Sequence, residues 1–485
     1  MGQADLGHVQ AARQVKTLWF ALAVAGAARA LPLLFGYEHY GDAPVRIELA
    51  EQWARAPHLW HGFVETYQYG PLHLTLLGLL GRLLGDRVIG ARLLSLGCGL
   101  LSVGLLWLIA RRERGEDAAM WAALGLALSP LHIQASTTGA SEAVFLALFL
   151  LALLRLLEDR VIRAAILLGA AGLVRYDGWL FVPLFAALLL YRRRDPYRAA
   201  GFCALAAAPA LAWMWINARY AGDALAPLRY IDRDHRALAQ MMLSWFGQLR
   251  WRLYGLAYFP VAVCVVVTPV LGIFALRGVA RALWRREPGW DLAALAWIPA
   301  AYFTFRTVVL ADFRPMARYA MVAAAISLLF VEVGRFRRLA MAVLIATPLA
   351  LFALSWNRNG ALAEWARPLS PVSSLPPGIA QAAEWLRHDA RPDDVVLLDS
   401  VWDYLDIPLA FAAGLPDEQW IRASWTDDFE QRLSRHRPTL AVLLYQGKLG
   451  DWTQDRFDFR GQRFCVQQRF VYAAIYRRCP RQVVE

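Results

Sequence analysis

Long apolar runs separated by short polar segments fill most of the chain up to about residue 356. Many of these runs approach the ~20 residues that an α-helix needs to cross a bilayer, and they lack the alternation of half-exposed strands. The pattern therefore predicts a polytopic α-helical membrane protein with about eleven spans. We expect them near residues 16–35, 88–110, 117–134, 141–157, 161–175, 178–191, 199–218, 254–276, 291–311, 317–334 and 338–356.

Some apolar segments are too short for an ordinary span. Residues 161–175 and 178–191 could together form one kinked or re-entrant unit. In the first outer loop, residues 36–87, the segment Ala43–Arg55 is amphipathic and Pro71–Leu84 is apolar but brief. We expect these two segments to be interfacial helices on the outer membrane face.

Clusters of Lys and Arg orient the spans. They fall on alternate ends of the predicted helices, as the positive-inside rule requires of cytoplasmic loops. This places the N-terminus in the cytoplasm and the C-terminal tail outside. The clusters are Arg13/Lys16, Arg111-Arg112-Glu113-Arg114, Arg160/Arg163, Arg192-Arg193-Arg194, Arg285-Arg286 and Arg335/Arg337-Arg338.

Residues 357–485 have a different character and predict a small α/β domain, distinct from a membrane domain over residues 1–356. A proline-rich linker precedes strands that alternate with helices. If this tail lies outside the cytoplasm, Cys465 and Cys479 could pair. We expect helices at Ile379–His388 and near 427–436, strands at Val395–Leu398 and Leu440–Leu444, and a closing hairpin from Phe464–Phe470 and Val471–Arg477.

Composition narrows the class of protein. Hydrophobic residues make up 58% of the chain, and 51 basic against 39 acidic residues give a net charge of +12. Because the arginines punctuate apolar runs, membrane topology and anionic lipids explain the charge better than nucleic acid. No basic-aromatic module and no glycine-rich nucleotide loop is present, so we expect membrane lipids and no nucleic acid as partners.

Asp42 is the leading candidate for chemistry. It follows the first span in Gly41-Asp42-Ala43-Pro44, in an otherwise apolar region. Aspartate is well suited to cap the helix that starts at Ala43, but a carboxylate here could equally serve as a reaction centre. Its position supports both interpretations.

Three further polar groups fall on the same predicted membrane face. Glu142 begins a span, where an acidic first turn is also favoured by the helix dipole. The segment Arg175-Tyr176-Asp177 could be a self-paired turn or part of a site. Arg318-Tyr319 heads a late span on the side that the topology bias disfavours, so Arg318 requires an anionic partner, either Asp312 or a ligand. The outer loop 219–253 is rich in interleaved Arg and Asp.

Carboxylates and arginines on one membrane face suit the transfer of a group from a lipid phosphate to a hydroxyl. A carboxylate would take the hydroxyl proton. Arginines would hold the phosphate and stabilise the charge that grows on it as it leaves. Asp42 and Glu142 could also share a divalent metal ion, although two separated acids are a weak signal for one.

The chain resembles the GT-C-type glycosyltransferases, in particular bacterial relatives of the protein O-mannosyltransferases and of the lipid A aminoarabinose transferase. The resemblance covers about residues 16–335 and depends on five stretches in order. These are Gly41-Asp42, Tyr69-Gly70-Pro71-Leu72, Ala91-Arg92-Leu93-Leu94-Ser95, Leu128-Ser129-Pro130-Leu131 leading to Ser141-Glu142-Ala143, and Gly172-Leu173-Val174-Arg175-Tyr176-Asp177-Gly178.

The resemblance implies a polyprenyl-phosphate sugar donor, a lipid, glycan or protein acceptor, and inversion at the sugar carbon. It also implies a multi-pass protein of the bacterial inner membrane with a periplasmic active site. Asp42 matches the catalytic carboxylate and Glu142 matches a second acid. Relatives often carry a basic residue before the second surface helix, where this chain has Tyr69-Gly70-Pro71. We therefore expect the donor phosphate to be bound by Arg175, Arg318 or His73. The wider set of expected substrate-binding residues adds Tyr69, Tyr176, Asp177 and Tyr319.

Other functions stay open at this point. A transporter or flippase of lipid-linked sugars would also be polytopic, but its charges should lie near the middle of the membrane. An O-antigen-ligase-like enzyme would use a pyrophosphate donor. A structural or sensory protein would use the C-terminal domain to bind a partner.

Overall fold

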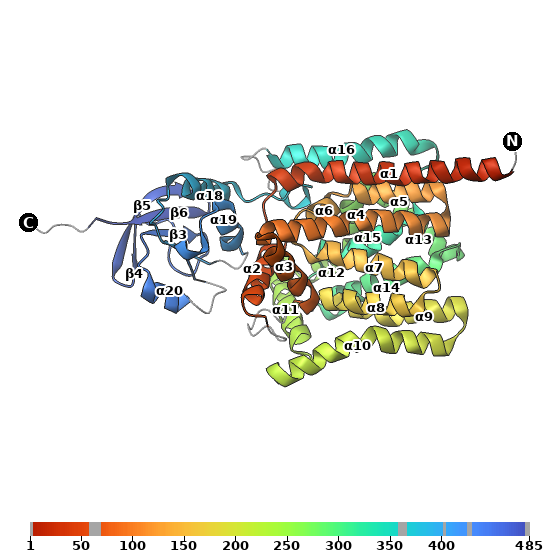
Figure 1. Cartoon of the computed structure of the whole chain (residues 1–485), viewed down its shortest axis with the longest axis horizontal. Helices are drawn as coiled ribbons and strands as arrows, with labels where there is room; N and C mark the ends of the chain where they lie inside the picture. Colours follow the sequence, from red (N-terminus) through yellow and green to blue (C-terminus); the bar gives the residue numbers. More distant parts are fainter. Residues whose placement is uncertain (1–2, 58–68, 357–365, 401–403, 424–428, 481–485) are drawn as a thin grey trace, which may run out of the picture.

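The computed structural model describes residues 3–57, 69–356, 366–400, 404–423 and 429–480. A bundle of helices is followed by a six-stranded sheet domain that lies at one end of the bundle (Figure 1). The helices of the first half are α1 (Gln3–Phe35), α2 (Ala43–Arg55), α3 (Pro71–Leu84), α4 (Arg87–Arg114), α5 (Glu116–Ala127), α6 (Pro130–Ala135), α7 (Ser141–Leu157), α8 (Val161–Val174), η1 (Tyr176–Leu180), α9 (Phe181–Arg193) and α10 (Pro196–Ala221). Those of the second half are α11 (Ala226–Phe246), α12 (Gln248–Val267), α13 (Pro269–Arg285), α14 (Trp290–Phe305), η2 (Arg306–Leu310), η3 (Ala317–Ala320), α15 (Met321–Ser327), η4 (Leu328–Phe330), η5 (Gly334–Phe336) and α16 (Arg337–Trp356).

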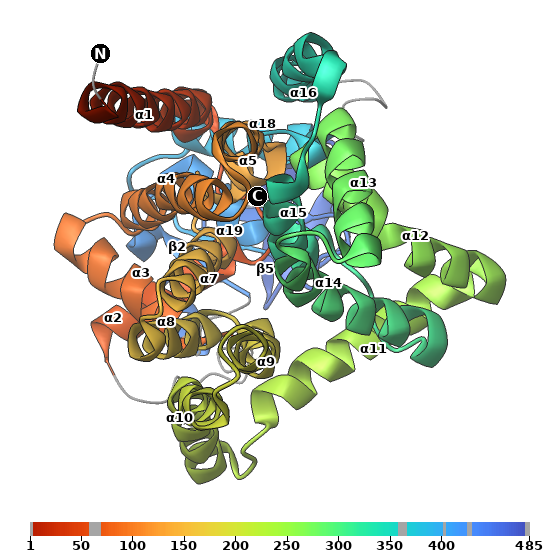
Figure 2. The same ribbon diagram turned by 90° about the vertical axis from the view of Figure 1, so that its right-hand side faces the viewer.

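The bundle is that of a multi-pass membrane protein. Most of its helices run side by side along the long axis, and the amphipathic α11 crosses them at one side (Figures 1 and 2). Within the described residues, six helical stretches are long and apolar enough to cross a bilayer. They are Lys16–Phe35, Arg87–Arg114, Pro196–Ala221, Gln248–Val267, Trp290–Leu310 and Gly334–Trp356. The predicted polytopic helical fold is confirmed, and the number of eleven spans stays a prediction.

The predicted span 117–134 is broken in the structure. Helix α5 ends at Ala127, and α6 begins at Pro130, with the Ser129 side chain accepting a hydrogen bond from the His132 amide. Proline disfavours a helical conformation for the residue before it, and serine is a good N-cap. The buried Arg29 of α1 donates to the freed carbonyl of Ala127 over 3.1 Å. The break is therefore stabilised by a guanidinium from another helix.

The prediction of one span over residues 254–276 is wrong. Helix α12 ends at Val267, and α13 begins at Pro269. Thr268 between them has an extended backbone, because the following proline excludes the helical region. The predicted span 317–334 corresponds to one apolar helix over Ala317–Phe330, in which η3, α15 and η4 follow one another without a break.

The two helices predicted in the first outer loop have the expected bounds. Helices α2 and α3 lie between the end of the bundle and the sheet domain (Figure 1). Helix α3 begins after Gly70, where a Cβ atom would overlap the carbonyl oxygens of Leu173 and Val174. The backbone of the loop therefore packs directly on the end of α8.

The C-terminal residues form the predicted α/β domain, with α19, β2 and β4 in addition to the elements expected from the sequence. The predicted helix near 427–436 lies partly outside the described residues, and α20 covers its later part. The elements are η6 (Arg367–Leu369), α18 (Pro377–Asp389), β1 (Val396–Leu398), α19 (Asp406–Ala413), η7 (Asp417–Gln419), β2 (Trp420–Arg422), α20 (Phe429–Arg435), β3 (Leu440–Leu444), β4 (Arg456–Phe459), β5 (Gln462–Phe470) and β6 (Ala473–Arg478).

The sheet has strand order β2-β1-β3-β6-β5-β4. Strands β2, β1 and β3 are parallel, and the remaining neighbours are antiparallel. Side chains alternate between two faces along β3, as a strand requires. Leu440 and Val442 pack with α18 and α19, whereas Ala441 and Leu443 face the second core beside α20.

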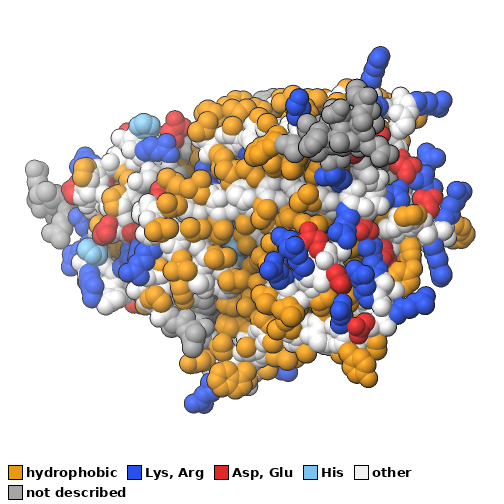
Figure 3. All heavy atoms as spheres, turned by 45° about the vertical axis from the view of Figure 1, so that its right-hand side comes forward, with side chains coloured by type: hydrophobic (Ala, Val, Ile, Leu, Met, Phe, Trp, Pro, Cys, Tyr) orange, Lys and Arg blue, Asp and Glu red, His pale blue; other side chains and the backbone are white. Residues whose placement is uncertain are grey.

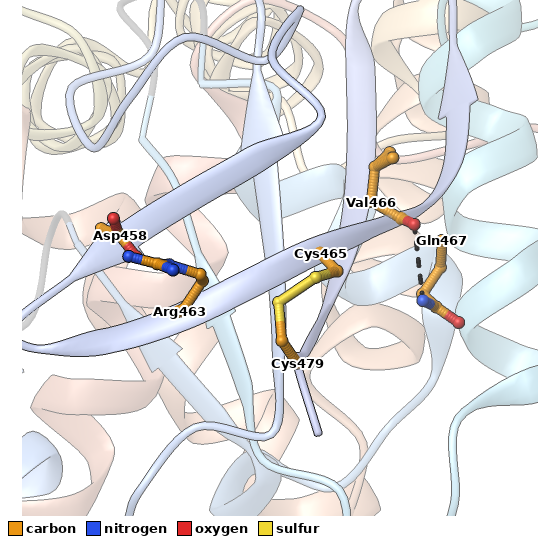
Figure 4. The surroundings of a disulfide bond; sticks show 6 residues. All are labelled: Asp458, Arg463, Cys465, Val466, Gln467 and Cys479. Carbon is orange, nitrogen blue, oxygen red and sulfur yellow. Dashed lines mark hydrogen bonds and ion pairs between the residues drawn. A yellow bond between two sulfur atoms is a disulfide. The ribbon is translucent and has the colours of Figure 1, made fainter. Parts of the chain in front are cut away.

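A disulfide joins Cys465 on β5 to Cys479, just after β6 (Figure 4). The Cα atoms are 5.3 Å apart, and the two cysteines are 14 positions apart in the sequence. The pairing that the sequence left conditional is thus present, between the neighbouring antiparallel strands β5 and β6. Disulfides persist mainly outside the cytoplasm.

Charge is distributed unevenly over the bundle. Lys and Arg side chains gather over the end away from the sheet domain, and hydrophobic side chains form a broad band along the flank (Figure 3). Arg111, Arg112 and Arg114 lie in the last turn of α4 at that end. This arrangement agrees with the alternation of charge that the sequence predicts.

Ion pairs dock the sheet domain onto helix α2. Arg422, at the end of β2, donates to Glu48 over 2.8 Å, and both side chains are buried. Asp417 pairs with Arg55 at 2.7 Å and with Arg87 at 2.9 Å. The carboxyl ends of the parallel strands therefore face the membrane bundle.

We expect Glu48→Gln to destabilise this docking strongly, because it leaves the buried guanidinium of Arg422 without its anion, a loss of about 3–5 kcal/mol. The double variant Glu48→Gln/Arg422→Met should regain much of that loss. The coupling between Glu48 and Arg422 is measured by thermal unfolding of four proteins. These are the unsubstituted protein, Glu48→Gln, Arg422→Met and the double variant. A double variant no more stable than Glu48→Gln would contradict the assignment.

Candidate active site

A cavity of about 570 Å³ lies at the end of the bundle next to the sheet domain. Its walls come from α2, η1, α11 and η3, together with a tyrosine of the sheet domain. Seven of the residues predicted from the sequence line it, which are Asp42, Tyr69, Arg175, Tyr176, Asp177, Arg318 and Tyr319. The other two, Glu142 and His73, are buried and are not among the lining residues.

Asp42 faces an arginine and does not cap its helix. It occupies the N-cap position of α2, yet its carboxylate makes no capping hydrogen bond. Instead, Asp42 Oδ2 accepts a hydrogen bond from Arg318 Nη1 over 2.7 Å. Asp86 shows the contrast, because its carboxylate accepts the amides of Val88 and Ile89 at the start of α4. The structure thus shows no side-chain cap at Asp42, and its role as a reaction centre stays a prediction.

The surroundings of Asp42 keep it ionised. Burial alone raises the pKa of this carboxyl, but the guanidinium of Arg318 and that of Arg46 together outweigh burial. The pKa of Asp42 therefore lies below its ordinary value. The carboxylate is therefore in the ionised form that can accept a proton, and its ion pair with Arg318 stabilises that form.

Arg175 is shared by two carboxylates. Its Nη1 donates to Glu142 Oε1 over 2.6 Å, and its Nε donates to Asp177 Oδ1 over 3.0 Å. Arg175 and Glu142 are both almost fully buried. Glu142 thus reaches the cavity only through Arg175, which makes it a residue that positions Arg175.

Tyr69 is fixed from behind by two hydrogen bonds in series. The Trp213 indole donates to the Tyr176 hydroxyl over 2.9 Å, and that hydroxyl donates to the Tyr69 carbonyl over 3.0 Å. The guanidinium of Arg46 lies over the Tyr69 ring, with Cζ 4.3 Å from the centroid. Arg46 was not predicted from the sequence, although it lies one helical turn after Asp42 and thus on the same face of α2.

Helix α11 supplies a second aromatic wall. His235 stacks on Phe313 with centroids 4.3 Å apart, and its Nε2 is 3.0 Å from the hydroxyl of Tyr319. Burial, together with Arg318 and Arg306, lowers the pKa of His235 to about 3, so its imidazole is neutral at working pH. Arg306 at the cavity wall is paired with Asp232 and Asp312. The sequence pointed to loop 219–253 only as a whole, because interleaved charges do not reveal which of them face inward.

The sheet domain contributes Tyr404 to the cavity. This residue follows β1 and has a φ of +55°, in the left-handed region that non-glycine residues seldom adopt. Its hydroxyl forms a hydrogen bond with Tyr69, and the negative charge of Asp42 acts on that hydroxyl. Strained backbone of this kind concentrates at functional sites. No local motif around Tyr404 marks it in the sequence.

An ion pair between the buried Glu38 and the half-buried Arg92 connects the two acidic segments. Glu38 accepts from Arg92 Nε over 2.5 Å with one oxygen and from the Gly139 amide over 2.9 Å with the other. Glu38 lies four positions before Asp42, and Gly139 lies three before Glu142. Arg92 also binds the carbonyl of Gly36 over 2.7 Å at the end of α1. One carboxylate therefore fixes the chain ahead of both acids.

The described residues hold no cluster of three or more His, Cys, Asp or Glu side chains placed to bind a metal ion. The carboxylates of Asp42 and Glu142 are instead engaged by Arg318 and Arg175. His73 is fully buried, and neither ring nitrogen has a partner in the part of the chain that the structure describes. It lies behind the cavity wall.

The chain is similar to known proteins in part of its sequence and in its fold. A family model described as dolichyl-phosphate-mannose-protein mannosyltransferase matches residues 68–213. The crystal structure of ArnT from Cupriavidus metallidurans in the apo state matches with a TM-score of 0.60 and 15% identity, over 98% of this chain and 98% of that chain. No curated protein sequence matches the chain.

Two further solved structures are similar. ArnT from Cupriavidus metallidurans bound to undecaprenyl phosphate matches with a TM-score of 0.60 and 15% identity, over 95% of this chain and 97% of that chain. An oligosaccharyltransferase of Archaeoglobus fulgidus, in complex with Zn and sulfate, matches with a TM-score of 0.50 and 15% identity, over 88% of this chain and 67% of that chain. The predicted GT-C fold is therefore confirmed, including the C-terminal domain.

We expect Glu142→Gln to lower the unfolding temperature more than Asp177→Asn does. A broken buried pair costs about 3–5 kcal/mol, and the cost falls as a partner becomes more exposed. The side chain of Glu142 is 6% exposed and that of Asp177 is 17% exposed. Thermal unfolding in detergent compares the two variants. Equal shifts would show that Glu142 does not hold Arg175 in place.

Proposed function

We propose that this chain, which has the GT-C glycosyltransferase fold, moves a sugar from a polyprenyl-phosphate carrier to an acceptor hydroxyl with inversion at the sugar carbon. The observation that carries the proposal is the Asp42–Arg318 pair, 2.7 Å apart on the wall of one cavity. It brings together a carboxylate that can take a proton and a guanidinium that can bind a phosphate.

The shape of the cavity supports a lipid-linked donor. Apolar and aromatic side chains such as Leu180, Phe303 and Phe313 line part of it. A site of this volume suits the sugar-phosphate head of such a donor, with the charged side chains of the wall as its polar anchors. The solved structure of ArnT holds undecaprenyl phosphate, a monophosphate carrier, and this likeness favours a monophosphate over a pyrophosphate donor.

In the proposed reaction, Asp42 accepts the proton of the acceptor hydroxyl while the hydroxyl oxygen attacks the anomeric carbon. The bond between that carbon and the phosphate oxygen breaks, and its electron pair leaves with the polyprenyl phosphate. Arg318 stabilises the charge that develops on the phosphate. Arg175, held by Glu142 and Asp177, adds positive charge to the same wall. Tyr69, Tyr176 and Tyr319 shape the donor site.

We further propose that the active site and residues 357–485 face the periplasm of a bacterial inner membrane, with the N-terminus in the cytoplasm. Lys and Arg gather at the opposite end of the bundle, as cytoplasmic loops require (Figure 3). The Cys465–Cys479 bond suits an oxidising compartment. The acceptor is a lipid, glycan or protein hydroxyl, and the likeness to transferases favours this function over a flippase or a sensory protein.

We expect Asp42→Asn to reduce sugar transfer by about 10²- to 10⁴-fold, the usual contribution of a general base, while donor binding persists. Asp86→Asn is the matched control, since Asp86 caps α4 in the same outer loop and lies outside this cavity. Transfer is measured with purified protein and a polyprenyl-phosphate sugar, and native mass spectrometry measures the bound lipid. Intact transfer by Asp42→Asn would exclude it as the base.

The acidic limb of the pH profile of kcat/KM should move to higher pH in Arg318→Gln. Arg318 is the strongest influence that lowers the pKa of Asp42, so without it burial raises that pKa. The base is then protonated at a pH where the unsubstituted protein keeps it ionised. A limb that stays in place, or moves to lower pH, would show that Asp42 does not govern it.

A further inference from the structure

Five arginines line the cavity of the candidate active site, and four of them have a carboxylate partner. Arg175 pairs with Glu142 and Asp177, Arg229 with Asp223, Arg306 with Asp232 and Asp312, and Arg318 with Asp42. The fifth, Arg46, has no ion pair and no hydrogen bond within the described parts of the chain. An arginine without an anion is unusual at a buried position.

Arg46 lies in the buried first half of α2, where every residue from Ala43 to Ala50 is buried. Its exposed fraction is 6%, and its Nη1 has no hydrogen-bond partner among the described residues. Removing a guanidinium from water is costly unless a partner anion compensates. The charge on Asp42 acts on it from a distance, but no carboxylate among the described residues lies within ion-pair distance.

The guanidinium is nevertheless held in place. Tyr69 lies beneath it at 4.3 Å from the ring centroid, and the Tyr69 backbone is fixed through Tyr176 and Trp213. A cation stacked on an aromatic face keeps its N–H groups at the edge of the plane, free to donate. Rigid, buried donors beside a cavity are a preorganised site for an oxyanion.

We propose that Arg46 binds the phosphate of the polyprenyl carrier, so that the missing anion of this arginine is the substrate. This assignment rests on the proposed function, in which the phosphate is the anion that enters the cavity. Arg46 then anchors the phosphate, whereas Arg318 is divided between that phosphate and Asp42. The donor phosphate then always has one cation, Arg46, that is not paired with the general base Asp42.

Stability separates this role from a structural one. If Arg46 had only a structural role, its replacement would lower the stability of the protein. Arg46→Gln should leave the unfolding temperature of the ligand-free protein unchanged or higher, because it removes a buried charge without a partner. The same variant should lose most of the stabilisation that undecaprenyl phosphate gives to the unsubstituted protein.

The experiment measures thermal unfolding and affinity for undecaprenyl phosphate in the full-length protein. We expect about 10- to 100-fold weaker binding in Arg46→Gln, the usual effect of losing a charge-assisted hydrogen bond. Arg46→Lys should fall between, because it keeps the charge without the planar fork. The matched control is Arg82→Gln, which removes an exposed arginine of the same outer loop and should bind as the unsubstituted protein does.

Each outcome decides the assignment. Unchanged affinity in Arg46→Gln, or a marked fall in its ligand-free unfolding temperature, would overturn the role of Arg46 alone. A change in acceptor KM with unchanged lipid affinity would also overturn it, because the anion would then belong to the acceptor. If the unsubstituted protein does not bind undecaprenyl phosphate at all, the proposed donor fails, and the assignment fails with it.

Discussion

Burial of charge in an apolar bundle is the constraint on which this structure depends. A guanidinium or carboxylate removed from water must meet an opposite charge or several hydrogen bonds. Glu38 meets Arg92 and an amide, and Arg29 meets the carbonyl of Ala127 at a helix break. Asp42 meets Arg318. Because these partners come from distant segments, the requirement for pairing fixes the ends of the helices relative to one another. The same requirement makes a buried charge without a partner informative.

Local patterns in the sequence predicted the elements well. The bounds of α2, α3, α7 and β3 depend on neighbouring residues alone, such as the proline at the second position of α2 and the glycine that ends α3. The errors in the predicted spans also have a local cause, which is the way hydropathy is read along the chain. Hydropathy averages over a window, so it passed through the proline breaks at residues 128–130 and 268–269 without registering them.

The site was predictable only in part, because partners distant in sequence decide what each polar residue does. Seven of the residues expected from motifs do line one cavity, yet the sequence could not show that Glu142 reaches it through Arg175. Arg46 resembles any arginine on an amphipathic helix until its lack of a partner is seen. Tyr404 depends on how two domains dock, which no pattern within either domain specifies.

The close approach at Gly70 bears on how this protein can change over evolution. The space where a side chain would begin is already filled by the carbonyl oxygens of Leu173 and Val174. Position 70 thus has no neighbouring variant that keeps the loop where it is, whereas Tyr69 on one side of it faces the cavity. A lineage that adapts this pocket to a new substrate can therefore vary the side chains around position 70, whereas Gly70 itself must stay glycine for the loop to keep its place.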